Sequence, residues 1–433
     1  MYKETKLSYD FTKYMQNLRR KIYSKLRQSE SFFKADMVYI VKSGSWLSLS
    51  QGIAMIAGFS ISIAFANLFP KESFGTYKFI ISMVAILGVF SFTGLNTSII
   101  QSAARGFGGA LRQGFRINLK WSLGMVLGGL GLSTYYYLNG NTLLAFSFLL
   151  AGLLSPLTTS ASLHSAYLMG KKDFKRSTFY GIVRNIIPTI ALILTLVISP
   201  VLPIIITVYF VIGVLVPLFL YYKTLRAYKH ENKKEDPALV SYSGHLSAMD
   251  VIGNFAHYLD KILIFHYLGA APLAIYAFAT APVEQLQGGK KILATLILPK
   301  ISGRSFKELQ ESGPRKALLL TVYALGLAFL WVIFAPYFYS FFFPQYLDSV
   351  LYSQIYAFTL LAVSGTIFNE TLIAHKKRKE LYVHRTIVPI FQIILFLILL
   401  PLYGLMGLVV THVIIRSFSG LLCYYFVKFP FRE

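Results

Sequence analysis

Apolar stretches long enough to cross a lipid bilayer recur along this whole chain. A spanning helix needs roughly 20 mostly apolar residues, and twelve such stretches can be marked. The first half contains those at 44–68, 75–100, 117–138, 142–168, 177–199 and 201–222. The second half contains those at 241–268, 271–299, 317–341, 350–374, 386–402 and 404–427. We therefore expect an all-α integral membrane protein with twelve transmembrane helices.

The composition supports a membrane protein over a soluble one. Only 14% of the 433 residues are charged and 55% are hydrophobic, whereas soluble chains carry about 25% charged residues. The net charge is +24, but on so apolar a chain cations are typical of cytoplasmic loops, so we expect no nucleic-acid partner. A single cysteine, Cys423, excludes an internal disulfide and a cysteine-based zinc site, and we expect no metal.

Basic residues fill every second connection between the expected spans. They follow spans two, four, six, eight and ten, and include Arg105, Arg112, Arg116, Lys171, Lys172, Lys223, Lys229, Lys300, Arg304, Lys376 and Arg385. The alternate connections hold only Lys71 and Lys78. Because positive loops stay in the cytoplasm, an even number of spans places both termini there.

The mid-chain linker divides the protein into two halves. We expect a basic cytoplasmic segment at 1–43, a six-helix bundle at 44–222, a cytoplasmic linker at 223–240, a second six-helix bundle at 241–427 and a tail at 428–433. Within the first segment, residues 9–30 alternate apolar and basic residues at helical spacing. That pattern is typical of a surface helix on anionic lipid, and the alternative is a solvated tail.

The two halves share a short internal repeat. Tyr77 and Phe79 correspond to Tyr276 and Phe278 at a constant offset, and each pair follows the first span of its half. Both halves begin and end on the basic side, so they run in the same sense. This arrangement predicts a pseudo-twofold axis along the membrane normal.

Polar residues line one face of several spans. In the seventh span the spacing alternates between four and three, which places six residues on one helix face: Ser243, Ser247, Asp250, Asn254, His257 and Lys261. Other spans contribute Tyr276, Thr280, Glu284, Gln287, Lys291, Thr366, Asn369, Glu370, His412, Arg416 and Arg184. Charges in a span usually face a watery cavity, so we expect one lined mainly by the second half. The alternatives are ion pairs that only fix packing, such as Asp250 with a basic neighbour, and an Arg184 that snorkels.

Catalytic and nucleotide-binding motifs are missing from the sequence. Gly288-Gly289-Lys290-Lys291 has neither the spacing nor the Ser or Thr of a phosphate-binding loop, and no H-E-x-x-H or G-x-S-x-G occurs. The connections on the less basic side are too short for a catalytic domain. We therefore expect a carrier without a cofactor rather than an enzyme.

Three motifs in order resemble one family of carriers. They are Phe65-Ala66-Asn67-Leu68 to Phe74-Gly75-Thr76-Tyr77 with Gly94-Leu95-Asn96, Asp260-Lys261 to Ile275-Tyr276-Ala277-Phe278, and Leu298-Pro299-Lys300-Ile301-Ser302. Over residues 37–425 the chain resembles the Wzx-type polysaccharide-export flippases, whose superfamily includes the MATE drug exporters and the lipid II flippase.

The resemblance implies a fold, a substrate and a place. Two six-helix bundles would form a V in the bacterial cytoplasmic membrane and carry an undecaprenyl-pyrophosphate-linked oligosaccharide across it by alternating access. The product would feed cell-surface polysaccharide assembly, such as O-antigen or exopolysaccharide, with a polymerase and chain-length proteins as possible partners. A MATE-type drug or metabolite exporter and a lipid II flippase stay open as alternatives.

Roles for the intramembrane residues follow from that resemblance. The cavity of the family is cationic, and the residues expected to bind substrate here are Lys261, Lys291, Arg416, Arg184, Asn254, His257, Gln287 and His412. Candidates for proton or sodium coupling are Asp250, Glu284, Asp260 and Glu370. Asp250 and Glu284 are preferred, because neighbours such as Asp260 and Lys261 point about 100° apart on a helix and need not touch. These four carboxylates oppose the cations, so the cavity is expected to be closer to neutral than that of the family.

Overall fold

The computed structural model describes residues 37–287, 301 and 304–431, and these residues form helices without any strand. The first half contains α2 (Met37–Leu68), α3 (Lys71–Leu87), η1 (Gly88–Phe90), α4 (Leu95–Ala104), α5 (Ala110–Trp121), α6 (Leu123–Leu138), α7 (Thr142–Ser162), α8 (His164–Gly170), α9 (Phe174–Ile198) and α10 (Leu202–Ala227). The second half contains α11 (Leu239–Tyr267), α12 (Ala270–Gln287), α14 (Phe306–Phe342), η2 (Pro344–Tyr346), α15 (Ser349–Ala357), η3 (Phe358–Val363), α16 (Gly365–Ala374) and α17 (Arg378–Lys428). The predicted surface helix at 9–30 lies outside the described residues.

Eight helical segments of the described part are long and apolar enough to cross a membrane. One of them, α17, is a pair of helices joined at Gly404, whose φ of 56° lies in the left-handed region that glycine tolerates. Helices α6 and α11, which cover two of the expected spans, are not among these eight. Helix α6 has only 16 residues, and the polar stripe of α11 lowers its mean hydropathy, so neither meets both the length and the hydropathy expected of a spanning helix. The chain is thus a multi-pass membrane protein, and the number twelve stays a prediction.

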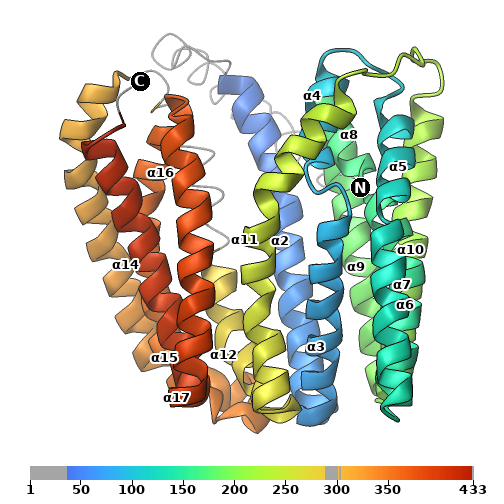
Figure 1. Ribbon diagram of the computed structural model, residues 1–433, viewed down its shortest axis with the longest axis vertical. Coiled ribbons are helices and arrows are strands. Elements are labelled where there is room, and N and C mark those ends of the chain that lie inside the picture. The colour runs from blue at the N-terminus through green and yellow to red at the C-terminus, as the bar shows by residue number, and fades with distance from the viewer. Residues whose placement is uncertain (1–36, 288–300, 302–303, 432–433) are drawn as a thin grey trace, which may run out of the picture.

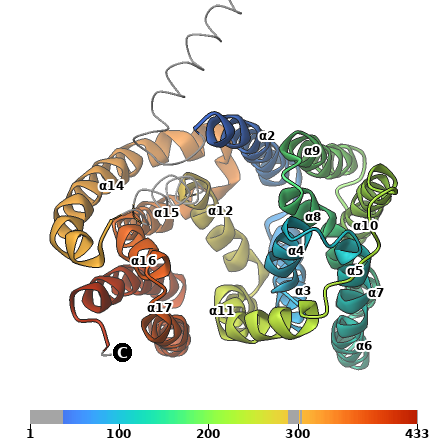
Figure 2. The same cartoon turned by 90° about the horizontal axis from the view of Figure 1, so that it is seen from above.

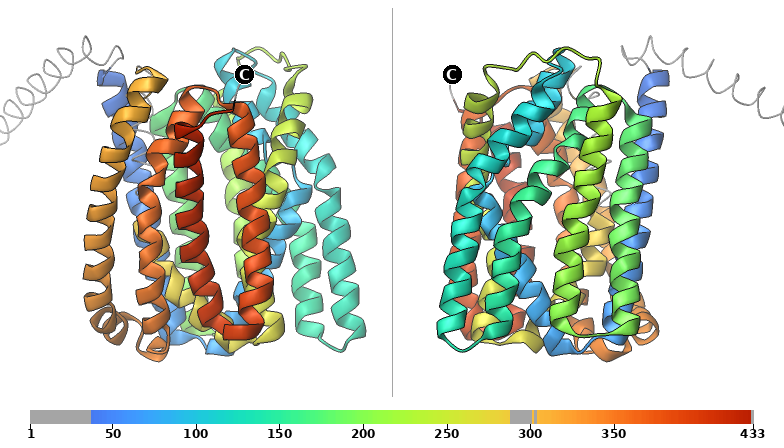
Figure 3. Two further views of the ribbon diagram at one scale, coloured as in Figure 1. Left: turned by 60° about the vertical axis from the view of Figure 1, so that its left-hand side comes forward. Right: turned by 90° about the vertical axis from the view of Figure 1, so that its right-hand side faces the viewer.

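The helices stand side by side with their connections at two ends (Figure 1). The upper end in that view holds α4, α8, the linker between α10 and α11, and the C-terminus. Short turns close the opposite end, which both side views also show (Figure 3). The basic connections after α4, α8 and α10 therefore share one end, as the alternation of charge requires.

Helices α11 and α12 lie between two groups of helices. Seen from above, α14 to α17 stand on one side and α4 to α10 on the other (Figure 2). The two repeat segments pack directly on each other here, because the rings of Phe74 on α3 and Phe278 on α12 are 4.7 Å apart. A Cβ on Gly75 would lie 1.8 Å from the carbonyl oxygen of Ala270, so this crossing requires glycine.

Helix ends and close crossings follow from particular residues. Asn141 caps α7 by accepting a hydrogen bond from the Leu144 amide at 3.0 Å, and Asp173 caps α9 in the same way. Between α6 and α7, a Cβ on Gly129 would lie 2.6 Å from the Cα of Gly152. Gly129 and Gly152 therefore serve helix packing, as is usual for small residues in membranes.

Candidate functional site

A buried carboxylate joins three helices at the middle of the molecule. Asp260 on α11 is only 1% exposed, and its Oδ2 accepts a hydrogen bond of 2.6 Å from the hydroxyl of Tyr276 on α12. The Nε2 atom of His412 on α17 lies 3.2 Å from the same oxygen and 2.7 Å from the Tyr276 hydroxyl. A proton on Nε2 would therefore be shared by both partners, so the packing of three helices depends on this group.

Lys261 contacts its neighbour in sequence. Its Nζ lies 3.3 and 3.4 Å from the two carboxylate oxygens of Asp260, because the long lysine side chain folds back along the helix. The sequence suggested that these two side chains need not touch, but in the structure they are in direct contact. The ammonium also faces the rings of Tyr258 and Tyr276, at 5.8 and 6.0 Å, and its side chain keeps 19% exposure. It can therefore still meet a ligand.

A second group of charges lies on α12 and α17. The Nη2 atom of Arg416 donates to the hydroxyl of Tyr356 at 2.8 Å, and that hydroxyl donates to Glu284 Oε1 at 3.0 Å. The arginine and the glutamate are 4.0 Å apart. Nη1 of Arg416 is buried and has no hydrogen-bond partner among the described residues. A buried guanidinium donor without a partner is costly, so Nη1 is free to donate to a further acceptor.

Lys78 belongs to this site, although its place in the sequence suggested a loop. It lies within α3 (Lys71–Leu87), and its charge interacts with those of Lys261 and Glu284. Its ammonium is 5.1 Å from the centre of the Phe74 ring. The signal that could have found it is a single lysine two turns inside an apolar span, which is a functional candidate by default. We call Lys78, Asp260, Lys261, Glu284 and Arg416 the central charged cluster.

Three further predicted residues lie on α9 and α11. Arg184 on α9 is exposed and lines a cavity of about 210 Å³ together with Asn185 and His164. His257 is exposed and interacts with Lys261 and Asp260. Asn254 lies half-buried one turn earlier on α11. No hydrogen bond or ion pair among the described residues joins Arg184 to the cluster.

Of the remaining predicted residues that the structure describes, one lies beside the cluster and the others do not. Gln287 donates to Thr359 at 2.8 Å and lines a cavity of about 370 Å³ with Arg416. Glu370 on α16 is buried beside Asn369, 3.4 Å away. Lys291 lies outside the described residues.

Asp250 makes the ion pair that the sequence left open as an alternative. Its Oδ1 is 3.7 Å from Arg385 on α17, and both side chains are 48% exposed. The structure therefore separates Asp250 and Glu370 from the central charged cluster. The cluster keeps three cations, Lys78, Lys261 and Arg416, against the two carboxylates of Asp260 and Glu284, so it is more basic than the sequence suggested.

Comparisons with known proteins agree on one family and one fold. A family model described as polysaccharide biosynthesis protein matches residues 40–303. No curated protein matches the sequence. A MOP-superfamily multidrug resistance MATE transporter, solved in an outward-facing conformation, has a TM-score of 0.61 at 12% identity, over 90% of this chain and 94% of that one.

Two further solved structures have the same fold. The lipid II flippase MurJ in an inward closed conformation has a TM-score of 0.62 at 16% identity, over 88% of this chain and 87% of that one. A MOP superfamily transporter from Pyrococcus furiosus, described by the reverse polarity of its binding pocket, has a TM-score of 0.57 at 13% identity. The match covers 90% of this chain and 96% of that one. At such identities these likenesses concern the fold alone. The family match covers more than half of the chain, and so this chain belongs to the polysaccharide biosynthesis protein family and has the fold of the MOP transporters.

Proposed function

We propose that this chain flips a polyprenyl-pyrophosphate-linked oligosaccharide across the bacterial cytoplasmic membrane, with both termini in the cytoplasm. The observation that carries the proposal is the buried Nη1 of Arg416, which has no partner in the described part of the chain. Arg416 shares its neighbour Glu284 with two further cations, Lys78 and Lys261. A pyrophosphate offers several charged acceptors, and charge-assisted hydrogen bonds to arginine are among the strongest in proteins.

The arrangement supports an anionic substrate rather than a cationic drug. Cations outnumber carboxylates in and around the central charged cluster, and Asp260 is already engaged by Tyr276, His412 and Lys261. A cationic drug would require free acidic groups in the same place. In this proposal the two helix groups rock around the cluster, and the lipid tail of the substrate stays in the bilayer.

The first test identifies the cargo. Depletion of the protein should cause a lipid-linked intermediate to accumulate, and mass spectrometry of its headgroup would name the glycan. A lipid-linked oligosaccharide supports the proposal, whereas accumulation of lipid II would assign the chain to peptidoglycan synthesis. No accumulated lipid, together with increased sensitivity to cationic drugs, would favour an exporter.

The second test removes the cations of the site. Replacing Lys78, Lys261 and Arg416 together by Ala should abolish export in a complementation assay while membrane insertion stays normal. The matched control replaces Lys307, Arg315 and Lys316, three exposed cations near the start of α14, and should retain export. Full complementation by the first triple variant would contradict the proposal.

We also propose that transport is coupled to protons or sodium at Asp260. Helices α11, α12 and α17 meet at this carboxylate, because Asp260 contacts Tyr276 and His412, so a change in its charge would alter how they pack. In proteoliposomes, Asp260→Asn should abolish the response of flipping to an imposed pH or sodium gradient. Asp250→Asn, at the exposed pair with Arg385, is the control and should keep it. Flipping that is equally fast with and without a gradient would make the protein a facilitator.

A further inference from the structure

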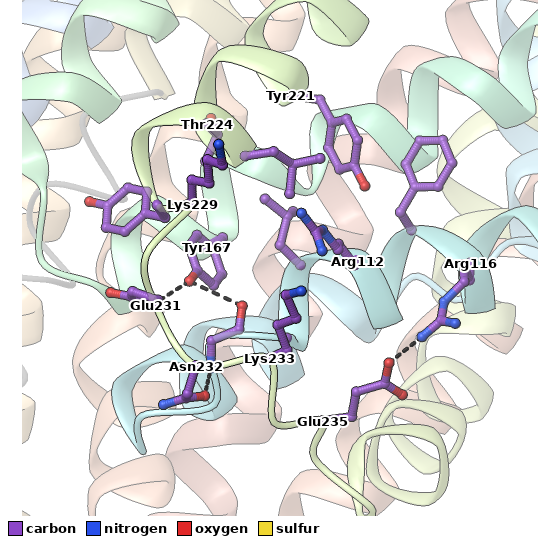
Figure 4. A pocket seen from close by; sticks show the side chains of 16 residues that line it. Arg112, Arg116, Tyr167, Tyr221, Thr224, Lys229, Glu231, Asn232, Lys233 and Glu235 are labelled. Carbon is purple, nitrogen blue, oxygen red and sulfur yellow. Dashed lines mark hydrogen bonds and ion pairs between the residues drawn. The ribbon is translucent and has the colours of Figure 1, made fainter.

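Another polar cavity lies at the end of the molecule that holds the linker, and it shares no lining residue with the central charged cluster. It has a volume of about 410 Å³, within the range of about 300–1,000 Å³ that is usual for small-ligand sites. Its walls come from α5, the end of α10 and the linker at 228–235 (Figure 4). The proposed function makes no use of this cavity.

The linker is fixed on the turn before α5 by a set of specific contacts. The side chain of Asn232 accepts a hydrogen bond from the Gly108 amide at 3.0 Å and donates one to the carbonyl of Gly106 at 3.0 Å. The Gly109 amide donates to the carbonyl of Lys234 at 2.9 Å. A Cβ on Gly108 would lie 2.0 Å from the carbonyl oxygen of Asn232. The close approach of the linker therefore needs glycine, and the cavity is built by the fold.

The acidic residues around the cavity hold the linker in place. Glu231 accepts a hydrogen bond of 2.8 Å from Tyr167 and pairs with Lys171 at 2.5 Å. Glu235 pairs with Arg116, as Figure 4 shows. Asp236 pairs with Arg105 at 2.5 Å. Each of the three carboxylates is therefore paired with a cation.

Three other cations line the same cavity without an ion pair in the part of the chain that the structure describes. Arg112 comes from α5, and Lys229 and Lys233 come from the linker. Aromatic side chains complete the walls, and the rings of Phe115 and Tyr221 are 4.7 Å apart. Burial and the hydrogen bond to Asp173 raise the pKa of Tyr228 to about 12, so its hydroxyl stays neutral and does not repel an anion.

We propose that this cavity binds a phosphate group carried by a small organic body. The forked guanidinium of Arg112 can form two parallel hydrogen bonds to phosphate oxygens, and Lys229 and Lys233 supply point charges. The aromatic wall would pack against the organic body. The phosphate can belong to an anionic phospholipid of the adjacent leaflet or to a soluble phosphate ester, because the recognition chemistry is the same.

Binding experiments on the full-length protein in nanodiscs separate these sources. In one arm the nanodiscs contain phosphatidylcholine with a small fraction of phosphatidylglycerol, and native mass spectrometry counts the retained phosphatidylglycerol. In the other arm the nanodiscs contain phosphatidylcholine alone, and adenosine monophosphate or glycerol 3-phosphate is titrated by calorimetry. A signal in the first arm only identifies a lipid headgroup, and a signal in the second identifies a soluble ligand.

Matched variants decide whether the signal comes from this cavity. Arg112→Gln with Lys233→Gln should weaken the observed binding by about tenfold, because two charged hydrogen-bond donors are lost. Lys307→Gln with Arg315→Gln removes the same charge from exposed positions near the start of α14 and should leave binding unchanged. If the first variant does not fold, judged by its melting temperature, Lys229→Gln alone is used in its place. Equal binding by the cavity and control variants, or no binding in either arm, would overturn the proposal.

Discussion

Tyr77 and Tyr276 hold corresponding positions in the two halves, but their surroundings differ. Tyr77 on α3 packs among aromatic rings, with Phe65 at 5.1 Å and Tyr209 at 5.7 Å. Tyr276 on α12 donates a hydrogen bond to Asp260 and contacts His412. The same repeat position thus serves packing in one half and a polar network in the other.

The charged residues of the site also differ between the two halves. At the constant offset of the repeat, Asp260 and Lys261 correspond to Ile61 and Ser62. Within the described residues, the Ser62 hydroxyl bonds only to the Gly58 carbonyl of its own helix, at 2.8 Å. Conversely, Lys78 corresponds to Ala277. The comparison teaches that the repeat supplies the helical frame, while Lys78, Asp260 and Lys261 each occur in one copy only.

The largest expected effect concerns the orientation of the two halves in the membrane. A reporter inserted at Asn232, in the linker, should give a cytoplasmic signal, and one inserted near Asp348 should give an external signal. Alkaline phosphatase and fluorescent-protein fusions measure the two outcomes in opposite directions. An external signal at Asn232 with a cytoplasmic signal near Asp348 would mean that the orientation in the membrane is the reverse of the one proposed. The same signal at both sites would contradict the two parallel halves.

The next largest effect is the loss of the buried carboxylate. Asp260→Ala leaves the charge of Lys261 without its partner and should lower the free energy of unfolding by about 3–5 kcal/mol. Ile61→Ala, at the corresponding half-buried position of the first half, should cost less because no charge is left unpaired. Thermal melting of both variants in the same detergent compares them, and equal losses would show that Asp260 only fills space.

A smaller effect is expected where the two repeat segments cross. Gly75→Ala brings a Cβ to 1.8 Å from the Ala270 carbonyl oxygen, and backbone cannot move aside cheaply, so the expected destabilisation is about 3 kcal/mol. The control is Gly131→Ala on α6, where no atom lies within 4 Å of the added Cβ. Melting temperatures should fall only for the first variant. An unchanged value for Gly75→Ala would mean that the crossing is looser than described.

The smallest effect compares the two tyrosines directly. Tyr276→Phe removes a hydrogen bond to a charged group and should cost about 1.5 kcal/mol, at the low end for such bonds, because Lys261 and His412 still contact Asp260. Tyr77→Phe should be nearly neutral, since the Tyr77 hydroxyl has no hydrogen bond within the described residues. Chemical denaturation of both variants measures the difference. A greater loss for Tyr77→Phe would reverse the assignment of roles.

Much of the helical frame was predictable, because an apolar span and its bounding turns are local features. The span expected at 241–268 is α11 (Leu239–Tyr267), and the turn expected after Ser199 separates α9 from α10. The family was also accessible, since its motifs are short and lie in order along the chain. These features depend on the hydropathy of short segments and on turn-forming residues such as Gly and Pro, both of which can be identified from the local sequence.

The site itself was determined only by the tertiary structure. Periodicity places Asp250 and Lys261 on one face of α11, yet Asp250 faces Arg385 while Lys261 reaches Asp260. A helix meets different neighbours along its length, so a shared face does not mean a shared environment. Lys78 joins the cluster only because α3 packs against α11 and α12. Sequence therefore determined which charges enter the membrane, and packing decided which of them meet, because electrostatic contact depends on distances between helices that no local pattern encodes.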